Sequence, residues 1–147
     1  MGRTDFTYTP GPYDPGVAFH EMSDEEAAAD AEHVAAAALA AARLTATRKL
    51  LAGPAAGLHM SAHDAAEVLT ARDDTDSRFE ALSYFEKPWA LLVLRLVALV
   101  LTDPGAAVRD ARARGATVAD IAATLGVTTN GVYKRFGDNV VRRPRKT

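Results

Sequence analysis

The side chains best suited to binding chemistry lie in the last third of the sequence. Hydroxyl, amide and cationic side chains recur there at short intervals: Thr117, Thr128, Thr129, Asn130, Tyr133, Lys134, Arg135, Arg142 and Arg143. Side chains of these types donate hydrogen bonds to phosphate oxygens, and an asparagine amide can bond to adenine through two hydrogen bonds. The chemistry that they indicate is recognition of a nucleic acid, without the making or breaking of a covalent bond.

Residues that would support catalysis or metal binding do not occur in a working pattern. His59 and His63 have the spacing of two zinc ligands on one helical face, but Ser61 is expected to begin a helix between them. The acidic run 73–76 resembles part of a calcium-binding loop, but Phe79 stands where such a loop requires glycine. The sequence contains neither a glycine-rich phosphate loop nor a nucleophile elbow. We therefore expect no enzymatic activity, no metal and no cofactor.

Charge is distributed unevenly along a chain whose formal net charge is only −2. From Gly105 to the end, nine Lys and Arg residues stand against three Asp residues, a net charge of +6, which leaves −8 for residues 1–104. A basic segment of this kind is typical of proteins that contact a polyanion, although a solvated basic tail has the same composition. The tail at 141–147 is expected either to contact phosphates or a minor groove, or to stay unbound and disordered.

Length and composition indicate one domain, or a small module with a helical attachment. The 147 residues are 48% hydrophobic and 24% charged, which is enough to build a core. Because the sequence contains no cysteine, neither a disulfide nor a thiolate metal site stabilises the fold. Residues 1–10 lack a secretory-signal pattern, and the most apolar run, 89–101, is too short for a membrane span and contains Arg95. We expect a cytoplasmic, nucleoid-associated protein with no membrane contact.

Helix signals dominate the first part of the chain. Residues 1–22 are rich in Pro, Gly and aromatic side chains without periodicity and are interpreted as a flexible arm. Ser23 and Glu26 form a capping-box pattern before an alanine-dense helix, which Gly53 and Pro54 end. On this helix we expect a narrow apolar stripe that needs a partner, formed by Val34, Ala37, Ala41, Leu44 and Leu51.

Two short helices and one strongly apolar helix are predicted next. Ser-x-x-acid patterns at Ser61 and Ser77 predict helices near 62–72 and 78–86. Residues 89–101 are apolar on nearly all sides, which predicts the central core helix or part of a dimer interface. A strand is the alternative for such a run, but its leucines and alanines, and the absence of strand partners, argue against it.

Three helices with short connections are predicted after residue 102. Asp103 and Pro104 predict the start of the first helix, and Gly115 its end. The second helix opens with a capping box formed by Thr117 and Asp120. Two helices that cross steeply through a tight turn also need a residue at positive φ and a small residue where they touch.

The next residues supply what such a turn requires. Gly126 follows the second helix, 118–125, and provides the positive φ, and Ala122 is the small contact residue. Thr128 caps the third helix and leaves its N-terminal residues free to face base edges. The expected buried residues of this part are Ile121, Leu125, Val127, Val132, Tyr133 and Phe136.

Residues 121–136, IAATLGVTTNGVYKRF, resemble the helix-turn-helix of TetR-type repressors, which typically reads I-A-x-x-x-G-V-S-x-x-x-L-Y-x-x-F. They are also similar to the C-terminal DNA-binding domain of serine recombinases and to short helix-turn-helix proteins common in actinobacteria. The resemblance implies that Thr128, Thr129, Asn130 and Lys134 contact bases and phosphates and that Tyr133 contacts a phosphate. TetR-type proteins carry the motif near the N-terminus before a ligand-binding domain, and serine recombinases add an α/β catalytic domain, so neither an inducer pocket nor recombination chemistry is carried over.

These patterns together predict an all-α protein with four parts: a flexible arm (1–22), a helical core or dimerisation region (23–102), a three-helix helix-turn-helix module (103–140) and a basic tail (141–147). The expected function is sequence-specific binding of double-stranded DNA by a small transcriptional regulator or nucleoid-associated protein, with a recognition helix at about 128–136 in the major groove. A homodimer joined through 89–101, 23–52 or both would place two such helices about 34 Å apart. The alternative is a DNA-tethered adaptor whose acidic N-terminal helical part binds another protein.

Overall fold

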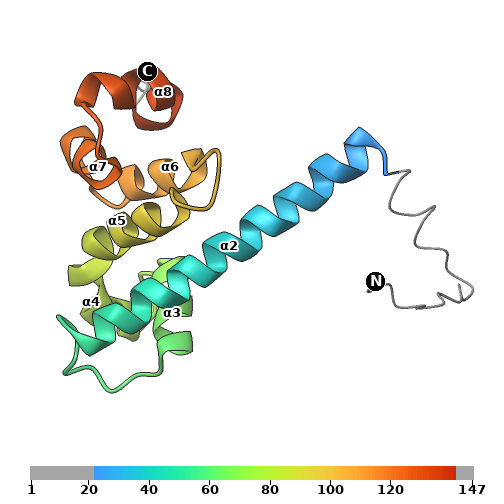
Figure 1. The fold of residues 1–147 in the computed structure, drawn as a ribbon. Helices are drawn as coiled ribbons and strands as arrows, with labels where there is room; N and C mark the ends of the chain where they lie inside the picture. The colour runs from blue at the N-terminus through green and yellow to red at the C-terminus, as the bar shows by residue number, and fades with distance from the viewer. Residues whose placement is uncertain (1–21, 142–147) are drawn as a thin grey trace, which may run out of the picture. The chain divides into compact units, whose positions relative to one another are not determined.

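The computed structural model describes residues 22–141, and all of its regular secondary structure is helical (Figure 1). The elements are α2 (Asp24–Ala52), α3 (Ala62–Ala71), α4 (Ser77–Leu82), the 3₁₀ helix η1 (Ser83–Phe85), α5 (Glu86–Val97), α6 (Gly105–Ala113), α7 (Val118–Leu125) and α8 (Thr129–Val140). The prediction of an all-α fold is confirmed. None of the helices within 22–141 has the length and apolar character needed to cross a membrane.

The described residues divide into two units, 22–34 and 35–141. The first of them contains the beginning of α2, from Asp24. The Glu26 backbone N–H donates to the Ser23 hydroxyl at 3.0 Å, and Asp24, Glu25 and Glu26 occupy the first turn. Acidic side chains at this end stabilise a helix because they face the positive end of its dipole.

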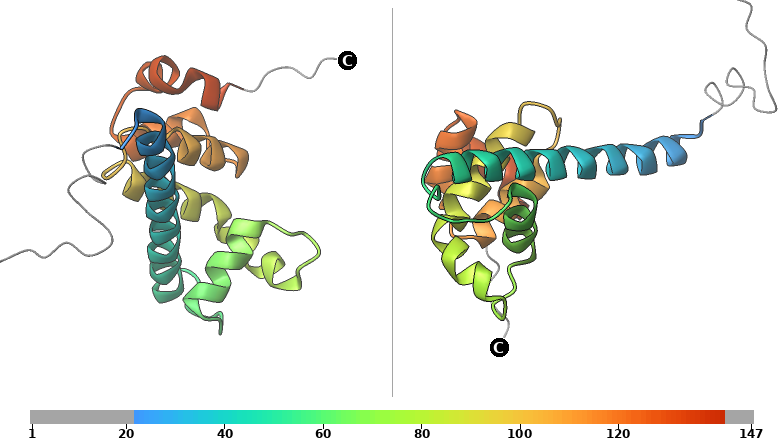
Figure 2. Two further views of the ribbon diagram at one scale, coloured as in Figure 1. Left: turned by 90° about the vertical axis from the view of Figure 1, so that its right-hand side faces the viewer. Right: turned by 90° about the horizontal axis from the view of Figure 1, so that it is seen from below.

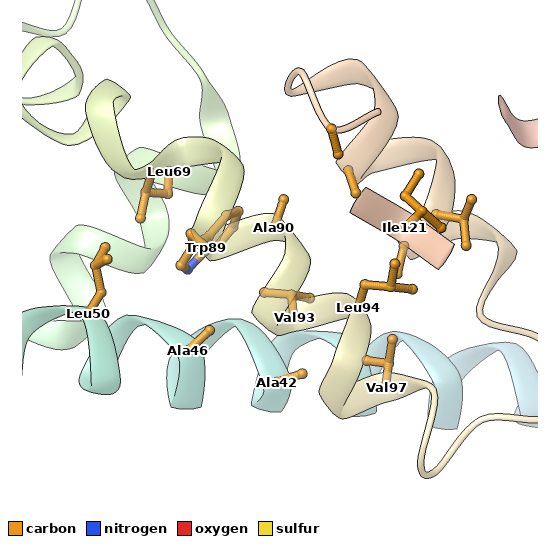
Figure 3. Packing of buried hydrophobic residues seen from close by; sticks show 14 of the residues in the cluster. Ala42, Ala46, Leu50, Leu69, Trp89, Ala90, Val93, Leu94, Val97 and Ile121 are labelled. Carbon is orange, nitrogen blue, oxygen red and sulfur yellow. The ribbon is translucent and has the colours of Figure 1, made fainter. Parts of the chain in front are cut away.

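The core of the second unit forms around α5, with which residues of α2 pack (Figure 3). Buried side chains of α5 are Trp89, Ala90, Val93, Leu94 and Val97. The residues of α2 in this core are Ala42, Ala46 and Leu50, four residues apart, and their small side chains allow the two helices to approach closely. Of the predicted stripe on α2, Leu51 packs partly buried against this core, whereas Val34 is exposed.

Several helix boundaries differ from the predicted ones by a few residues. Ser61 caps α3 as predicted, but Asp76 rather than Ser77 caps α4, because its carboxylate accepts from the Arg78 backbone N–H at 3.0 Å. The apolar helix α5 ends at Val97, four residues before the end of the apolar run. Leu99 and Val100 consequently lie outside the core and are 80% and 69% exposed.

The last three helices form a packed group next to α5. α5 packs against α6 and α7, and α8 packs against both α6 and α7. Figure 2 shows the same neighbours from two further directions, with α6 to α8 in orange and red. Their buried side chains belong to the same core cluster as those of α5: Ala107, Val108, Ala111, Val118, Ile121, Ala122, Val132, Phe136 and Val140. The backbone of α8 is kinked at Phe136, where φ is −124° and ψ is 26°.

Candidate nucleic-acid interface

Two side-chain caps and one glycine define the start of α7 and its connection to α8. The Thr117 hydroxyl accepts from the Asp120 backbone N–H at 3.0 Å, and the Asp120 carboxylate accepts from the Thr117 backbone N–H at 2.9 Å. α7 ends at Gly126, whose φ of 70° lies in the left-handed region. The Thr128 hydroxyl then accepts from the Gly131 N–H at 3.0 Å and caps α8. The predicted capping box, the positive φ and the cap on α8 are confirmed.

The inner face of this group is closed by aliphatic and aromatic side chains. Ile121 and Ala122 of α7 are buried against Val132 and Phe136 of α8. Val132 and Phe136 are four residues apart and so take the same face of α8. Because Tyr133 is one position further round the helix, it is 49% exposed, and the prediction that it is buried is wrong.

Two further residues of this predicted core are also placed differently. Val127 lies in the turn between the helices and is 46% exposed, whereas burial was predicted. Leu125 is only partly buried, at the edge of the core. The α7–α8 turn therefore has an apolar side chain on its outer surface, beside the N-terminus of α8.

The outer face of α8 carries the polar residues that the sequence singled out. Thr129, Asn130 and Lys134 are exposed, and Tyr133 lies among them on the same face of the helix. Thr129 and Asn130 occupy the first turn of α8, directly after the Thr128 cap. An amide, a phenol and an ammonium group thus project from one short, capped helix whose opposite face is buried.

The remaining predicted site residues have other contacts or lie outside the described range. The Arg135 Nη2 donates to the Thr102 carbonyl at 3.0 Å, and its guanidinium lies 4.7 Å from the centre of the Phe136 ring. The hydroxyls of Thr117 and Thr128 are both engaged in capping. Arg142 and Arg143 lie outside the described residues.

Two arginines that contribute to the basic count are used inside the fold. Arg112 Nε donates to the Val140 carbonyl at 3.0 Å, and its Nη1 donates to the Ala116 carbonyl at 3.2 Å. Arg114 is buried and bonds to Asp110 and Glu86 at 2.9 and 3.0 Å. Two of the nine basic residues counted from Gly105 onward are thus committed to contacts within the fold. The i,i+4 spacing of Asp110 and Arg114 is a sequence signal for one of these contacts, whereas those with Glu86 and Val140 have none.

At the N-terminus of α7, the carboxylate of Asp120 is kept ionised by neighbouring groups. The pKa of Asp120 is lowered to about 2, first by the hydrogen bond from the Thr117 backbone N–H, then by Lys87 and by the Thr117 hydroxyl. Lys87 Nζ lies 2.9 Å from the Asp120 carboxylate. Lys87, on α5, was not among the predicted site residues, although it lies beside the helix whose cap was predicted.

His59 and His63 are both exposed. Among the residues from 22 to 141, no group of three or more His, Asp or Glu side chains is placed to hold a metal ion. Comparison of the chain with protein-family models, with curated proteins and with solved structures finds no match.

Proposed function

We propose that the chain binds double-stranded DNA through a helix-turn-helix formed by α7 and α8, as a small transcriptional regulator or nucleoid-associated protein. The observation that supports this proposal is the outer face of α8, on which Asn130, Tyr133 and Lys134 are exposed while Val132 and Phe136 anchor the opposite face. A recognition helix needs both properties, because its polar face has to enter the groove while the protein holds its position.

The dimensions of α8 suit a DNA groove. Its part before the kink at Phe136, residues 129–135, corresponds to about 10 Å at a rise of about 1.5 Å per residue, and the major groove, about 12 Å wide, admits a helix. Recognition helices of this kind contact base edges with their N-terminal residues, which here are Thr129 and Asn130. In this pose Asn130 bonds to an adenine edge, and Lys134 and Tyr133 contact phosphates.

Electrostatic attraction contributes most of the affinity in this proposal. Lys134 is an exposed cation on the outer face of α8, and the sequence adds Arg142, Arg143, Arg145 and Lys146 after the helix. Each phosphate that such a residue neutralises releases condensed counterions, so that affinity falls as salt rises. DNA binding of this type would also place the protein in the nucleoid.

A salt series on the full chain tests the proposal. Fluorescence anisotropy with a labelled random duplex should show binding at about 50 mM salt and a linear fall of log affinity with log salt up to about 200 mM. Lys134→Ala should weaken binding, whereas Lys49→Ala, which removes the same charge from an exposed position on α2, should change it less. Absence of a complex with any duplex at low salt would refute DNA binding.

We also propose that the protein binds DNA as a homodimer. Leu99 and Val100 are 80% and 69% exposed at the end of α5, and an apolar contact between two copies would cover them. Two-fold symmetry then sets two α8 helices about 34 Å apart and predicts a palindromic site. Leu94 is fully buried within one copy and is not part of such a contact.

A further inference from the structure

An apolar groove runs between α2 and α3, on residues that the proposed DNA contact does not use. It encloses about 530 Å³, which lies within the range of small-molecule sites, about 300–1,000 Å³. Its walls consist mostly of small apolar side chains: Ala40, Ala41 and Leu44 from α2, and Ala66 and Ala71 from α3. Arg43, His63, Glu67 and Thr70 are the polar residues that line it.

Arg43 is poorly satisfied in this position. Its Nε is buried and has no hydrogen-bond partner within residues 22–141. Its nearest opposite charge is Asp110 Oδ2, at 4.0 Å from Nη2, and the Arg43 side chain is only 22% exposed. The same Asp110 oxygen already accepts a hydrogen bond from Arg114 Nε at 2.9 Å. The Asp110 carboxylate thus interacts with two guanidinium groups, and its interaction with Arg43 is the weaker one because the distance is longer.

A partly buried guanidinium whose nearest anion is 4.0 Å away can bind an additional anion. Burial lowers the pKa of Arg43, Asp110 acts in the opposite direction, and the nearby charge of Arg114 lowers it further. Buried polar groups in native proteins nearly always have partners, and an orphaned one needs an explanation, such as a water or an ion that satisfies it. Arginine binds carboxylates especially well, because its planar fork matches the two carboxylate oxygens.

We propose that this groove binds a small organic monocarboxylate, with its carboxylate on Arg43 and its short apolar body against the alanines of α2 and α3. Glu67 lines the same groove and repels a second negative charge, which favours a monoanion over a dianion. The site is formed by α2 and α3, and its occupation does not depend on whether α8 binds DNA.

Isothermal titration of the full chain with hexanoate, in a buffer free of carboxylates and without DNA, tests the site. Hexanoate should bind saturably at one site per chain, and hexan-1-ol, which has the same apolar body and no charge, at least tenfold more weakly. Arg43→Gln should abolish hexanoate binding. Glu67→Gln should tighten it several-fold, and this exposed substitution keeps the test valid if the Arg43 variant fails to fold.

Arg48→Gln is the matched control, because it removes the same charge from an exposed position on α2 that does not line the groove. It should leave hexanoate binding unchanged. Equal binding of hexanoate and hexan-1-ol, equal loss in the Arg43 and Arg48 variants, or the absence of saturable binding would overturn the proposal. Binding of acetate as tightly as hexanoate would likewise overturn the role of the apolar walls.

Discussion

The guanidinium of Arg114 lies 4.8 Å from the centre of the Trp89 indole ring, and both side chains are buried. Trp89 Nε1 donates to the Thr47 hydroxyl at 2.9 Å, and Arg114 Nη1 donates to the Leu69 carbonyl at 2.7 Å. Because Arg114 also bonds to Glu86, this cluster connects residues of α2, α3 and α5 to the residue that follows α6. Residues of α2, α3 and α5 are thus joined to the end of α6 by polar contacts as well as by the apolar core.

Removing Arg114 should destabilise the fold strongly. Arg114→Ala removes the buried partner of Glu86 and Asp110, which keep the more exposed Arg72 and the more distant Arg43, and should lower the free energy of unfolding by roughly 3 kcal/mol. Arg78→Ala is the control, because Arg78 pairs with Asp76 at the surface and such exposed pairs contribute little to stability. Urea unfolding followed by circular dichroism measures both. Equal losses in the two variants would contradict a structural role for the buried cluster.

The cap on α7 should make stability depend on acid pH. The folded pKa of Asp120, about 2, lies below its ordinary value of 3.8. Its contribution to stability is therefore fully present above about pH 4 and disappears as the pH falls through about 2. Asp120→Asn should be less stable than wild type at pH 7 and should approach wild type at pH 2, as measured by urea unfolding at both pH values. A constant difference between the two proteins would contradict this assignment.

The Thr117 side of the same cap can be tested separately. Thr117→Ala removes the hydroxyl that accepts the Asp120 N–H and should cost about 1 kcal/mol of unfolding free energy. Thr117→Ser keeps the hydroxyl and should cost much less. If the two variants were equally stable, the hydroxyl would not be acting as a cap.

Much of this local structure follows from the sequence because caps and glycine turns depend on few residues. Thr117, Asp120, Gly126 and Thr128 act on backbone groups within four positions of themselves, and all were predicted correctly. The sequence predicted Ser77 instead of Asp76 as the cap of α4, because Asp and Ser both cap helices well and stand here at neighbouring positions.

Features that depend on packing between distant parts of the chain could not be predicted from the sequence in the same way. Sequence spacing predicted burial of Tyr133 and a stripe through Val34, but which face of a helix is buried depends on its neighbours. The use of Arg114 inside the fold depends on partners 28 and 45 positions away, at Glu86 and Leu69. Only the Arg114 pair with Asp110, four positions away, has a local spacing signal; the contacts with Glu86 and Leu69 have none.

Two glycines should respond in opposite directions to substitution by alanine. Gly126 has a φ of 70°, and Gly126→Ala should cost about 1–2 kcal/mol because a Cβ strains the left-handed region. Gly137 lies within α8, and a Cβ there meets nothing within 4 Å, so Gly137→Ala should stabilise by about 0.5–1 kcal/mol. Thermal unfolding of both variants measures the difference. A stabilising effect at Gly126 would be inconsistent with the turn described above.

Asn130 and Lys134 should affect DNA binding in different ways. Asn130→Ala should cost about 1–3 kcal/mol on a selected site and relax the preference at one base pair, because it removes contacts to a base edge. Lys134→Ala should weaken specific and random DNA alike and reduce the salt slope by about 1, because it removes a phosphate contact. Competition titrations with both DNAs separate the two effects. Equal losses for Asn130→Ala on both DNAs would exclude a base contact.

The dimer contact can be separated from the core of one copy. Leu99→Glu places a charge on an exposed residue and should give a folded monomer, whereas Leu94→Glu buries a charge and should unfold the chain. Light scattering gives the mass, and circular dichroism shows whether each variant is folded. A wild-type protein that stays monomeric at micromolar concentration, with and without DNA, would exclude the dimer.

If α8 enters the major groove as proposed, the kink at Phe136 limits how much sequence information one copy can extract from DNA. The straight part of α8 before it, residues 129–135, is about 10 Å long at a rise of about 1.5 Å per residue. With base pairs stacked about 3.4 Å apart, such a segment reads about three of them, which distinguishes on the order of 64 sequences. A genome offers millions of positions, so that one α8 alone would find very many equivalent matches. Selectivity would then come from a dimer that reads two short half-sites at a fixed separation.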